Sequence, residues 1–402
     1  MSSIFEGFLS TPEALEAFGE RSFLQAMLDV EAALARAQAR AGLIPEAAAT
    51  AIAAACKVEL FDTAAIVRDS AVAGTLAVPL VQSLKETVAR SSKEAAGFVH
   101  LGATSQDVID TALVLVTRRV LRLIEANVYK AATALLALAQ QHAGAPVLAR
   151  TLMQPASVTS FGLKCAGWAA PLVRSLQRID VASGRALRLQ LGGAVGTLAQ
   201  MKGKGPEVVG LMAAALALQA PDAAWHTQRD EWLALGCELG LLAGSLGKVA
   251  KDIALMGQYE VGEVAEPSGA GRGGSSAMPH KRNPVACMVA LAAAQRAPQR
   301  VAALLAAMPQ EHERALGNWQ AELAEWPGLL AAVHGSAHAM AEALAGLQVN
   351  TPRMRANIDT LRAELPADAA DEWFSMALAA QAGELAQAQI NNQLAALGAL
   401  KR

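Results

Sequence analysis

The most constraining feature of this sequence is a stripe of apolar residues that recurs every three or four positions after Asp107. That spacing keeps one face of a helix apolar for about eight turns. The stripe consists of Ile109, Leu113, Val116, Val120, Ile124, Val128, Ala131 and Leu135. A helix of about 35 residues is about 50 Å long, and ordinary globular helices are much shorter. The chain is therefore expected to build a bundle of long helices.

Four other segments show similar long helical patterns, at about 157–189, 229–257, 284–307 and 326–347. The composition agrees, because 53% of the residues are hydrophobic while only 4% are aromatic, and alanine and leucine dominate. Strong helix formers outnumber β-branched residues, which predicts an all-α protein. Partner subunits usually cover helices of this length in bundles. An oligomer is therefore expected on physical grounds alone.

The patterns divide the chain into three expected domains. Residues 1–98 carry short helical patterns, of which 23–41 stops at Gly42, and they predict a small N-terminal helical domain. Residues 99–347 contain the five long patterns of the central bundle. Residues 348–402 are more polar and lack a long apolar stripe, so a short C-terminal helical domain is expected there.

Charge and cysteine usage exclude several classes of partner. Lys and Arg total 34 against 36 Asp and Glu, the net charge is -2, and no basic stripe for nucleic acid is present. The N-terminus lacks the pattern of a signal peptide, and charged or amide residues interrupt each apolar run before about 18 residues. A cytoplasmic protein without nucleic-acid or membrane partners is expected. The four scattered cysteines are interpreted as reduced thiols: Cys56, Cys165, Cys237 and Cys287.

The segment 274–284 carries the strongest chemical signal. It places Ser275, Ser276, Lys281 and Asn283 within a few residues, directly after a run of glycines. Glycines permit unusual dihedrals and large motions, which favours a mobile lid. Hydroxyls, an ammonium and a carboxamide together can hold a carboxylate and move a proton beside it. A purely structural turn has no need of this set.

Two other segments leave alternatives open. Thr104 and Ser105 precede the first long helix, with Asp107 in its first turn. They can cap that helix, or the same backbone N–H groups and hydroxyls can bind an anion. Arg314 follows another long helix, either as part of a solvated helix end or as a bidentate clamp for a carboxylate.

Signals for metals and dinucleotides are weak. His334 and His338 lie four residues apart on a helix, but no carboxylate or cysteine cluster accompanies them, so ordinary helix histidines are expected. The glycines at 269–274 match G-x-G-x-x-G, which has meaning only between a strand and a helix of a βαβ unit. A helical pattern precedes them here, so a dinucleotide site is not expected.

Residues 274–284 resemble, nearly letter for letter, the signature loop of the fumarase/aspartase superfamily, whose enzymes make or break a bond β to a carboxylate through a carbanion. Residues 100–107 and 150–154 are similar to two further blocks of that superfamily. The resemblance implies that Ser275 transfers the proton and that no metal or organic cofactor is needed. The expected substrate-binding residues are His100, Thr104, Ser105, Thr151, Gln154, Ser276, Lys281, Asn283 and Arg314.

The implied fold is the three-domain α-helical homotetramer, in which three subunits build each active site around a small di- or tricarboxylate. Residues 309–322, and more weakly 353–359, resemble the 3-carboxy-cis,cis-muconate cycloisomerase branch. That branch implies closure of a 3-substituted muconate to its lactone in the degradation of aromatic compounds. The 3-substituent stays open between carboxylate, sulfonate and halogen, and the tail after Asp359 matches the superfamily poorly.

One departure from the superfamily is informative. Leu152 stands where fumarases and adenylosuccinate lyases have a histidine that donates or relays a proton. A general acid contributes about 10²–10⁴-fold when the leaving group needs a proton. Water and amines need one, whereas a carboxylate, whose conjugate acid has a pKa of about 4, does not. Leu152 thus favours the cycloisomerase over the alternative of another β-elimination lyase. A catalytically silent helical scaffold is the second alternative.

Overall fold

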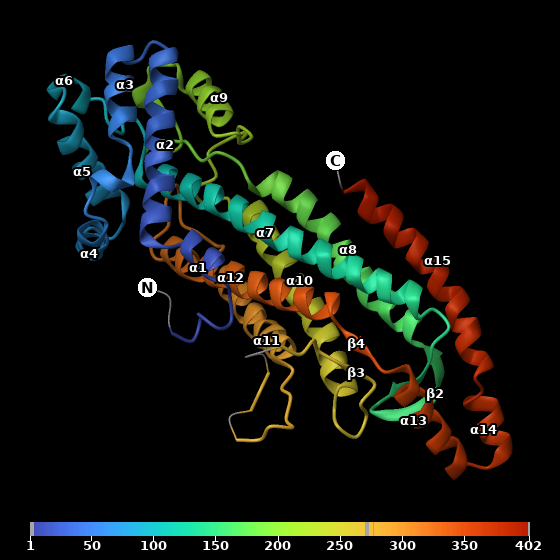
Figure 1. The fold of residues 1–402 in the computed structure, drawn as a ribbon. Helices are drawn as coiled ribbons and strands as arrows, with labels where there is room; N and C mark the ends of the chain where they lie inside the picture. Colours follow the sequence, from blue (N-terminus) through green and yellow to red (C-terminus); the bar gives the residue numbers. More distant parts are fainter. Residues whose placement is uncertain (1–3, 270–272, 276, 401–402) are drawn as a thin grey trace.

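The computed structural model describes residues 4–269, 273–275 and 277–400. The N-terminal helices gather at one end of the molecule (Figure 1, blue), where α2 packs against its neighbours around Leu24, Met27, Ile52 and Leu80. These elements are α1 (Pro12–Ala17), α2 (Glu20–Arg40), α3 (Glu46–Ala55), the 3₁₀ helix η1 (Val58–Leu60), α4 (Thr63–Ala73), α5 (Ala77–Ala89) and α6 (Lys93–Ala96).

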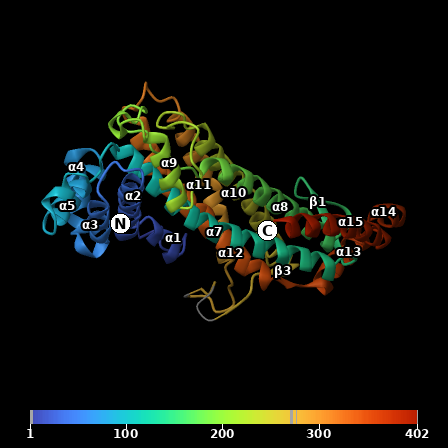
Figure 2. The same cartoon turned by 90° about the horizontal axis from the view of Figure 1, so that it is seen from above.

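The five long helices predicted from the sequence are confirmed. They are α7 (Ser105–Gln141), α8 (Phe161–Ala186), α10 (Asp230–Met256), α11 (Val285–Ala306) and α12 (Asn318–Ala345), and they run along one another in the long body of the molecule (Figures 1 and 2). Every residue of the predicted apolar stripe on α7 is buried. The all-α class is therefore confirmed.

Two boundaries differ from the sequence pattern. The segment 157–189 does not begin as a helix, because β2 (Gln154–Ser160) pairs antiparallel with β1 (Pro146–Thr151) before α8 starts. Helix α12 begins at Asn318, eight residues before the expected Trp326, and its first turns bury Glu322. An apolar pattern counts glutamate as solvent-facing, so it missed those turns.

The remaining elements join and cover the bundle. The 3₁₀ helix η2 (Ala199–Met201) and α9 (Gly205–Ala215) lie between α8 and α10 in the chain, and β3 (Val264–Ala265) pairs antiparallel with β4 (Gln348–Val349). The C-terminal part contains α13 (Thr351–Glu364), α14 (Ala367–Trp373) and α15 (Ala377–Ala399). The expected domain boundaries at 98 and 347 stay a prediction.

Helix α15 differs from the short, polar tail that the sequence indicated. It has 23 residues and packs along α8 (Figure 1, red). Half of its buried positions are alanines, and the others are Ile390, Gln393 and Leu397. Alanine contributes little to a hydrophobic pattern, yet it lets two helices approach closely. The stripe was therefore present but weak in the sequence.

Helix α10 has the length and composition of a membrane span, and it is the one such helix in the described ranges. Glu238 and Lys248 interrupt its apolar sequence, as expected. Of its most apolar window, 56% is buried inside the protein, because α10 packs against α8, α11 and α12. We interpret α10 as a core helix of the bundle.

The acid stability of the fold depends on His334. This side chain is 2% exposed and its Nδ1 has no hydrogen-bond partner among the described residues. Burial, assisted by the nearby His338, lowers its pKa from 6.5 to about 4. As the pH falls from 6.5 towards 4, His334 is protonated in the unfolded chain but stays neutral in the folded chain. The free energy of unfolding therefore falls as the pH falls. The loss is roughly 3 kcal/mol, at about 1.4 kcal/mol per pKa unit.

We expect His334→Gln to reduce this acid sensitivity between pH 7 and pH 4.5. Urea unfolding at several pH values measures it. His338→Gln, which removes an exposed imidazole one turn away, is the control and is expected to keep most of the sensitivity. An unchanged slope in His334→Gln contradicts the assignment.

Candidate functional site

A buried carboxylate organises the start of α7. Asp107 closes a capping box by accepting the N–H of Thr104 at 3.0 Å. It also accepts the N–H groups of Gly192 and Gly193, each at 2.9 Å, and lies 2.7 Å from Nε2 of His226. A side chain at Gly192 is impossible, since its Cβ would lie 2.5 Å from Ala224. The glycine turn is therefore fixed onto the first turn of α7.

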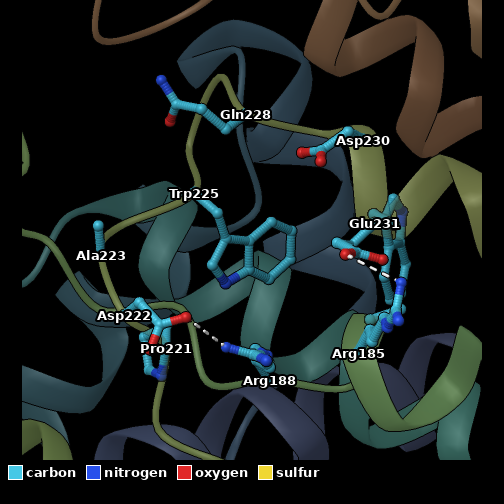
Figure 3. A pocket seen from close by; sticks show the side chains of 11 residues that line it. Arg185, Arg188, Pro221, Asp222, Ala223, Trp225, Gln228, Asp230 and Glu231 are labelled. Atoms are coloured by element: carbon cyan, nitrogen blue, oxygen red, sulfur yellow. Dashed lines mark hydrogen bonds and ion pairs between the residues drawn. The ribbon is translucent and has the colours of Figure 1, made fainter.

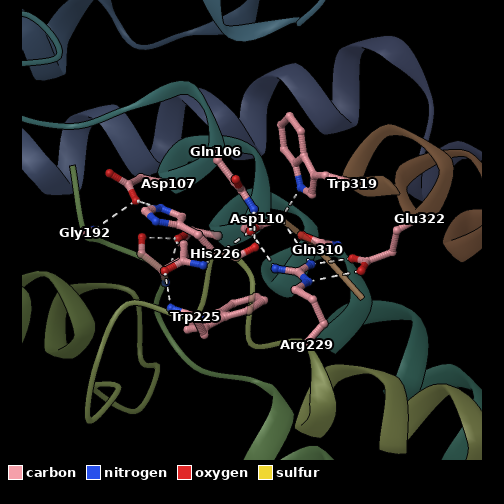
Figure 4. Close-up of polar contacts among 12 residues, drawn as sticks. Gln106, Asp107, Asp110, Gly192, Trp225, His226, Arg229, Gln310, Trp319 and Glu322 are labelled. Carbon is pink, nitrogen blue, oxygen red and sulfur yellow. Dashed lines mark hydrogen bonds and ion pairs between the residues drawn. The ribbon is translucent and has the colours of Figure 1, made fainter. Parts of the chain in front are cut away.

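One turn further along α7, a second carboxylate belongs to a fully buried charge cluster (Figure 4). The guanidinium of Arg229 donates to Asp110 at 2.8 Å and to Glu322 at 3.1 Å, and none of the three side chains is exposed. Trp319 donates its indole N–H to Asp110 at 2.9 Å, and Trp225 lies over the guanidinium, 4.4 Å from ring centre to Cζ. The cluster joins the starts of α7, α10 and α12.

The pKa shifts follow from this arrangement. Burial alone would lower the pKa of Arg229, but Asp110 and Glu322 outweigh it and raise the pKa, so the guanidinium stays charged. Burial raises the pKa of Glu322, and Arg229 opposes that rise. Burial lowers the pKa of Arg314, while Asp107 and Asp110 act in the opposite direction.

The structure brings four predicted site residues to the start of α7. Thr104 is the N-cap residue and Ser105 is the first residue of the helix. Arg314 donates to Oγ1 of Thr104 at 2.6 Å, so the residues that the sequence left as a cap and a helix end lie in contact. His100 precedes them in a turn and lies 2.6 Å from Glu31, between Nδ1 and Oε1. A guanidinium, hydroxyls and a helix N-terminus suit a carboxylate.

Thr151 and Gln154 lie elsewhere, at the exposed end of the β1–β2 hairpin. Arg150, one residue earlier, is tied to Glu263 by two hydrogen bonds of 2.7 and 2.9 Å, which anchors the hairpin. Leu152 and Met153 form the turn with φ of 50° and 67°, and Leu152 is 96% exposed. Thr151 and Gln154 are therefore not in contact with Thr104 or Arg314 in one chain.

The loop of the strongest sequence signal is folded on itself. Ser275 accepts the N–H of Met278 at 3.1 Å, and Asn283 donates its N–H to Gly273 at 2.7 Å. Gly273 has a φ of +69°, and a Cβ there would lie 2.5 Å from the carbonyl oxygen of Asn283. Lys281 is exposed. Ser276 lies outside the described residues.

The N-terminus of α11, next to this loop, is already occupied. Glu266 accepts the N–H groups of Ala286 at 3.0 Å and Cys287 at 2.8 Å. Asn283 and Glu266 line a cavity of about 240 Å³ beside it. This helix start therefore holds a carboxylate from outside the helix, whereas the carboxylate at the start of α7, Asp107, belongs to the helix itself.

Helix α11 separates the two groups of site residues. Its 22 residues correspond to about 33 Å, with the Ser275 loop before it and Arg314 after it. Figure 2 shows the two loops on opposite sides of the bundle. One chain thus has the start of α7, with Thr104 and Arg314 in contact, at one end of α11 and the Ser275 loop at the other. The expected site is not formed within a single chain.

Sequence reasoning missed His226, Arg229 and Glu322. Each is a single polar residue without a motif around it. A signal existed only for Asp110 and Glu322, which are carboxylates on the buried faces of helices. Such carboxylates require a buried cation, which the pattern alone could not identify as Arg229.

A further pocket of about 200 Å³ is lined by Trp225 together with Arg185, Arg188, Asp222 and Glu231 (Figure 3). Arg188 pairs with Asp222 at 3.0 Å and Arg185 with Glu231 at 3.9 Å, so both guanidinium groups have a carboxylate partner. No unpaired cation lines the pocket, so it lacks a positive charge that is free to bind an anion. In the described ranges, no three His, Cys, Asp or Glu side chains are grouped to hold a metal ion.

Known proteins resemble this chain over most of its length. A family model described as Lyase matches residues 8–298. A 3-carboxy-cis,cis-muconate cycloisomerase of Pseudomonas aeruginosa is 46% identical over 382 residues, which cover 95% of this chain and 82% of that protein. A nitrosuccinate lyase of Streptomyces davaonensis is 42% identical over 351 residues, which cover 85% of this chain and 74% of that protein.

A solved structure agrees. The crystal structure of 3-carboxy-cis,cis-muconate lactonizing enzyme from Pseudomonas putida matches with a TM-score of 0.88 and 38% identity, over 100% of both chains. The identity is high enough for the likeness to extend beyond the fold alone.

The charge cluster predicts a large stability effect. Arg229→Met leaves Asp110 and Glu322 buried without a cation, which costs about 3–5 kcal/mol. Chemical denaturation measures the loss. The control is Arg185→Met, whose guanidinium is exposed and 3.9 Å from its partner, and its effect is expected to stay below about 1 kcal/mol. Equal effects of the two variants contradict the cluster's role.

Proposed function

This chain belongs to the lyase family, and from that premise we propose that it is a cycloisomerase. It closes 3-carboxy-cis,cis-muconate, or a close 3-substituted muconate, to its lactone during the degradation of aromatic compounds. The observation that carries the proposal is the similarity, over 95% of the chain, to a 3-carboxy-cis,cis-muconate cycloisomerase. A cytoplasmic location and turnover without a metal or organic cofactor belong to the same proposal.

The hairpin turn supports this reaction class. Leu152 occupies the position where related lyases carry a histidine, and its apolar side chain is almost fully exposed to solvent. A reaction that expels water or an amine needs an acid. In lactone formation a carboxylate of the substrate attacks its own chain, and in the reverse direction a carboxylate leaves without a proton. One proton-transfer group, at carbon, is then sufficient.

The residues take the following roles in the proposed reaction. Thr104, Ser105 and Arg314 bind one substrate carboxylate at the start of α7, while Lys281 and Asn283 bind another. Holding both ends selects the folded conformer in which the carboxylate reaches the double bond. Negative charge then develops on the carbon beside a carboxylate, and the nearby cations and donors stabilise it. The Ser275 hydroxyl delivers the proton to that carbon, with Thr151, Gln154 and Ser276 contacting the substrate.

These roles require assembly, so we include in the proposal a homotetramer whose active sites are shared between subunits. Two observations support it. The groups of site residues lie at opposite ends of α11 in one chain, about 33 Å apart. The left-handed backbone of Leu152 and Met153 is what a two-residue hairpin turn requires, and the turn leaves both apolar side chains exposed, as an interaction surface would.

One alternative function is supported by a specific observation. Nitrite, like a carboxylate, leaves without protonation, so Leu152 also suits the elimination implied by the 42% identical nitrosuccinate lyase. The purified protein should be mixed separately with 3-carboxy-cis,cis-muconate, nitrosuccinate and adenylosuccinate. Loss of the conjugated ultraviolet absorbance in the first mixture supports the cycloisomerase. Fumarate formation in either of the others, without turnover of the muconate, overturns it. Turnover of none, by a folded oligomer, favours a silent scaffold.

Ser275→Ala is expected to lower kcat by about 10²–10⁴-fold with a nearly unchanged KM, because the hydroxyl acts on the reacting carbon. Steady-state kinetics with the muconate measure it. Ser268→Ala removes an exposed hydroxyl of the same loop and is expected to retain normal turnover. Near-normal turnover in Ser275→Ala removes that residue from its role.

Two inactive variants are expected to complement each other when the site spans subunits. Ser275→Ala and Arg314→Met, unfolded together and refolded as a mixture, should recover up to about a quarter of wild-type activity by random assembly. The mixture of Ser275→Ala with Lys281→Met is the control, because both residues belong to one loop and no site receives an intact one. If neither mixture recovers activity, the active site is not shared between subunits.

A further inference from the structure

Glu31 is a buried carboxylate that the proposed reaction leaves unused. It lies on α2 among apolar residues, and it is 1% exposed. Its Oε1 is 2.6 Å from Nδ1 of His100, while its Oε2 is buried without a hydrogen-bond partner among the described residues. A buried ionised carboxylate is costly unless it is paired. His100 is therefore the group that stabilises this charge.

The backbone of His100 is held as firmly as its ring. His100 has a φ of 61°, a left-handed conformation that is uncommon for a residue with a side chain. Gln38, two turns along α2 from Glu31, donates to the carbonyl oxygen of the next residue, Leu101, at 2.6 Å. Helix α2 thus fixes both the ring and the turn that carries it. Strain of this kind persists where the surrounding structure determines it.

The arrangement leaves one ring nitrogen for a ligand. With Nδ1 facing Glu31, Nε2 makes no hydrogen bond within the described part of the chain, and 17% of the side chain is exposed. The same turn leads directly into Thr104, which Arg314 contacts. The free nitrogen therefore belongs to the end of the molecule that carries the anion-binding start of α7.

The charges around the ring favour its protonated form. Burial would lower the pKa of His100, but the charge and the hydrogen bond of Glu31, together with the charge of Asp107, raise the pKa above its ordinary value of 6.5. Asp107 on α7 acts in the same direction as Glu31, and Lys85 on α5 opposes them. These are the charged groups that face the ring from the three helices around it.

We propose that Glu31 is a positioning residue that holds His100 as an imidazolium, so that Nε2–H donates to the substrate carboxylate bound beside Thr104. The proposal rests on the proposed function for the identity of that carboxylate. A proton relay through this pair is disfavoured, because Glu31 is enclosed and His100 is its hydrogen-bond partner. His100 thus contributes fixed positive charge and one directed donor, and Ser275 keeps the transfer of the proton.

The test is Glu31→Gln, which keeps the shape of the side chain and removes its charge. Substrate binding is expected to depend on a protonated His100, so kcat/KM should fall on the alkaline side. In Glu31→Gln that fall should move to lower pH by one unit or more, with KM raised about tenfold at pH 8 and near-normal kcat/KM restored at pH 6. Glu20→Gln, an exposed carboxylate of the same helix, is the control and should match the wild type.

Two outcomes overturn the proposal. An unchanged alkaline limb in a folded Glu31→Gln variant shows that Glu31 does not set the charge of His100. A fall in kcat at constant KM assigns His100 to proton transfer instead. If Glu31→Gln does not fold, His100→Gln serves as the second variant. It should raise KM and abolish the alkaline limb, and retention of that limb also overturns the proposal.

A measurement without substrate separates this inference from the proposed function. The imidazole of His100, identified by its loss in His100→Gln, can be titrated by NMR in the substrate-free protein. Its pKa should fall in Glu31→Gln and stay unchanged in Glu20→Gln. If the pKa of His100 falls only in Glu31→Gln while the protein fails to convert the muconate, the result supports the Glu31–His100 interaction and contradicts the proposed substrate. If His100 titrates identically in Glu31→Gln and Glu20→Gln, Glu31 does not set the charge of His100, whatever the substrate is.

Discussion

The guanidinium of Arg229, enclosed between Asp110 and Glu322, is the interaction on which the site end of this protein depends. Replacing such a buried cluster as a whole can be neutral, but removing one member is expensive. The cluster therefore acts less as a source of stability than as a constraint on geometry. It fixes where α7, α10 and α12 begin, and the start of α7 is where we place a substrate carboxylate.

The length of the helices determines which residues can meet within one chain and which can meet only between chains. A helix such as α11 carries its two ends about 33 Å apart, so residues in the adjoining loops cannot meet within a chain. In the homotetramer that we propose, the same length provides long faces along which copies of the chain can pack. In the assembly that we propose, an active site divided between subunits follows from building with long helices, and activity depends on assembly.

The sequence predicted the five long helices because a 3.6-residue apolar period over many turns has no other good interpretation. It failed at β2, where a strand of mixed polarity adjoins a true helical pattern, and at α15, where half of the buried residues are alanines. It found Thr104 and Arg314 as candidates, and their contact at 2.6 Å was not predictable, since 210 residues separate them. Glu31 could not be identified as a site residue, because one carboxylate in a helix is ordinary until its burial is known.

The hairpin turn at Leu152 and Met153 has a consequence for how copies of the chain come together. Each non-glycine residue in the left-handed region costs about 1–3 kcal/mol, and here the isolated chain already bears that cost. A turn that is bent in advance has little conformational entropy left to lose on docking. In the assembly that we propose, association through this tip is a docking of preformed surfaces, governed by diffusion and orientation rather than by folding upon contact.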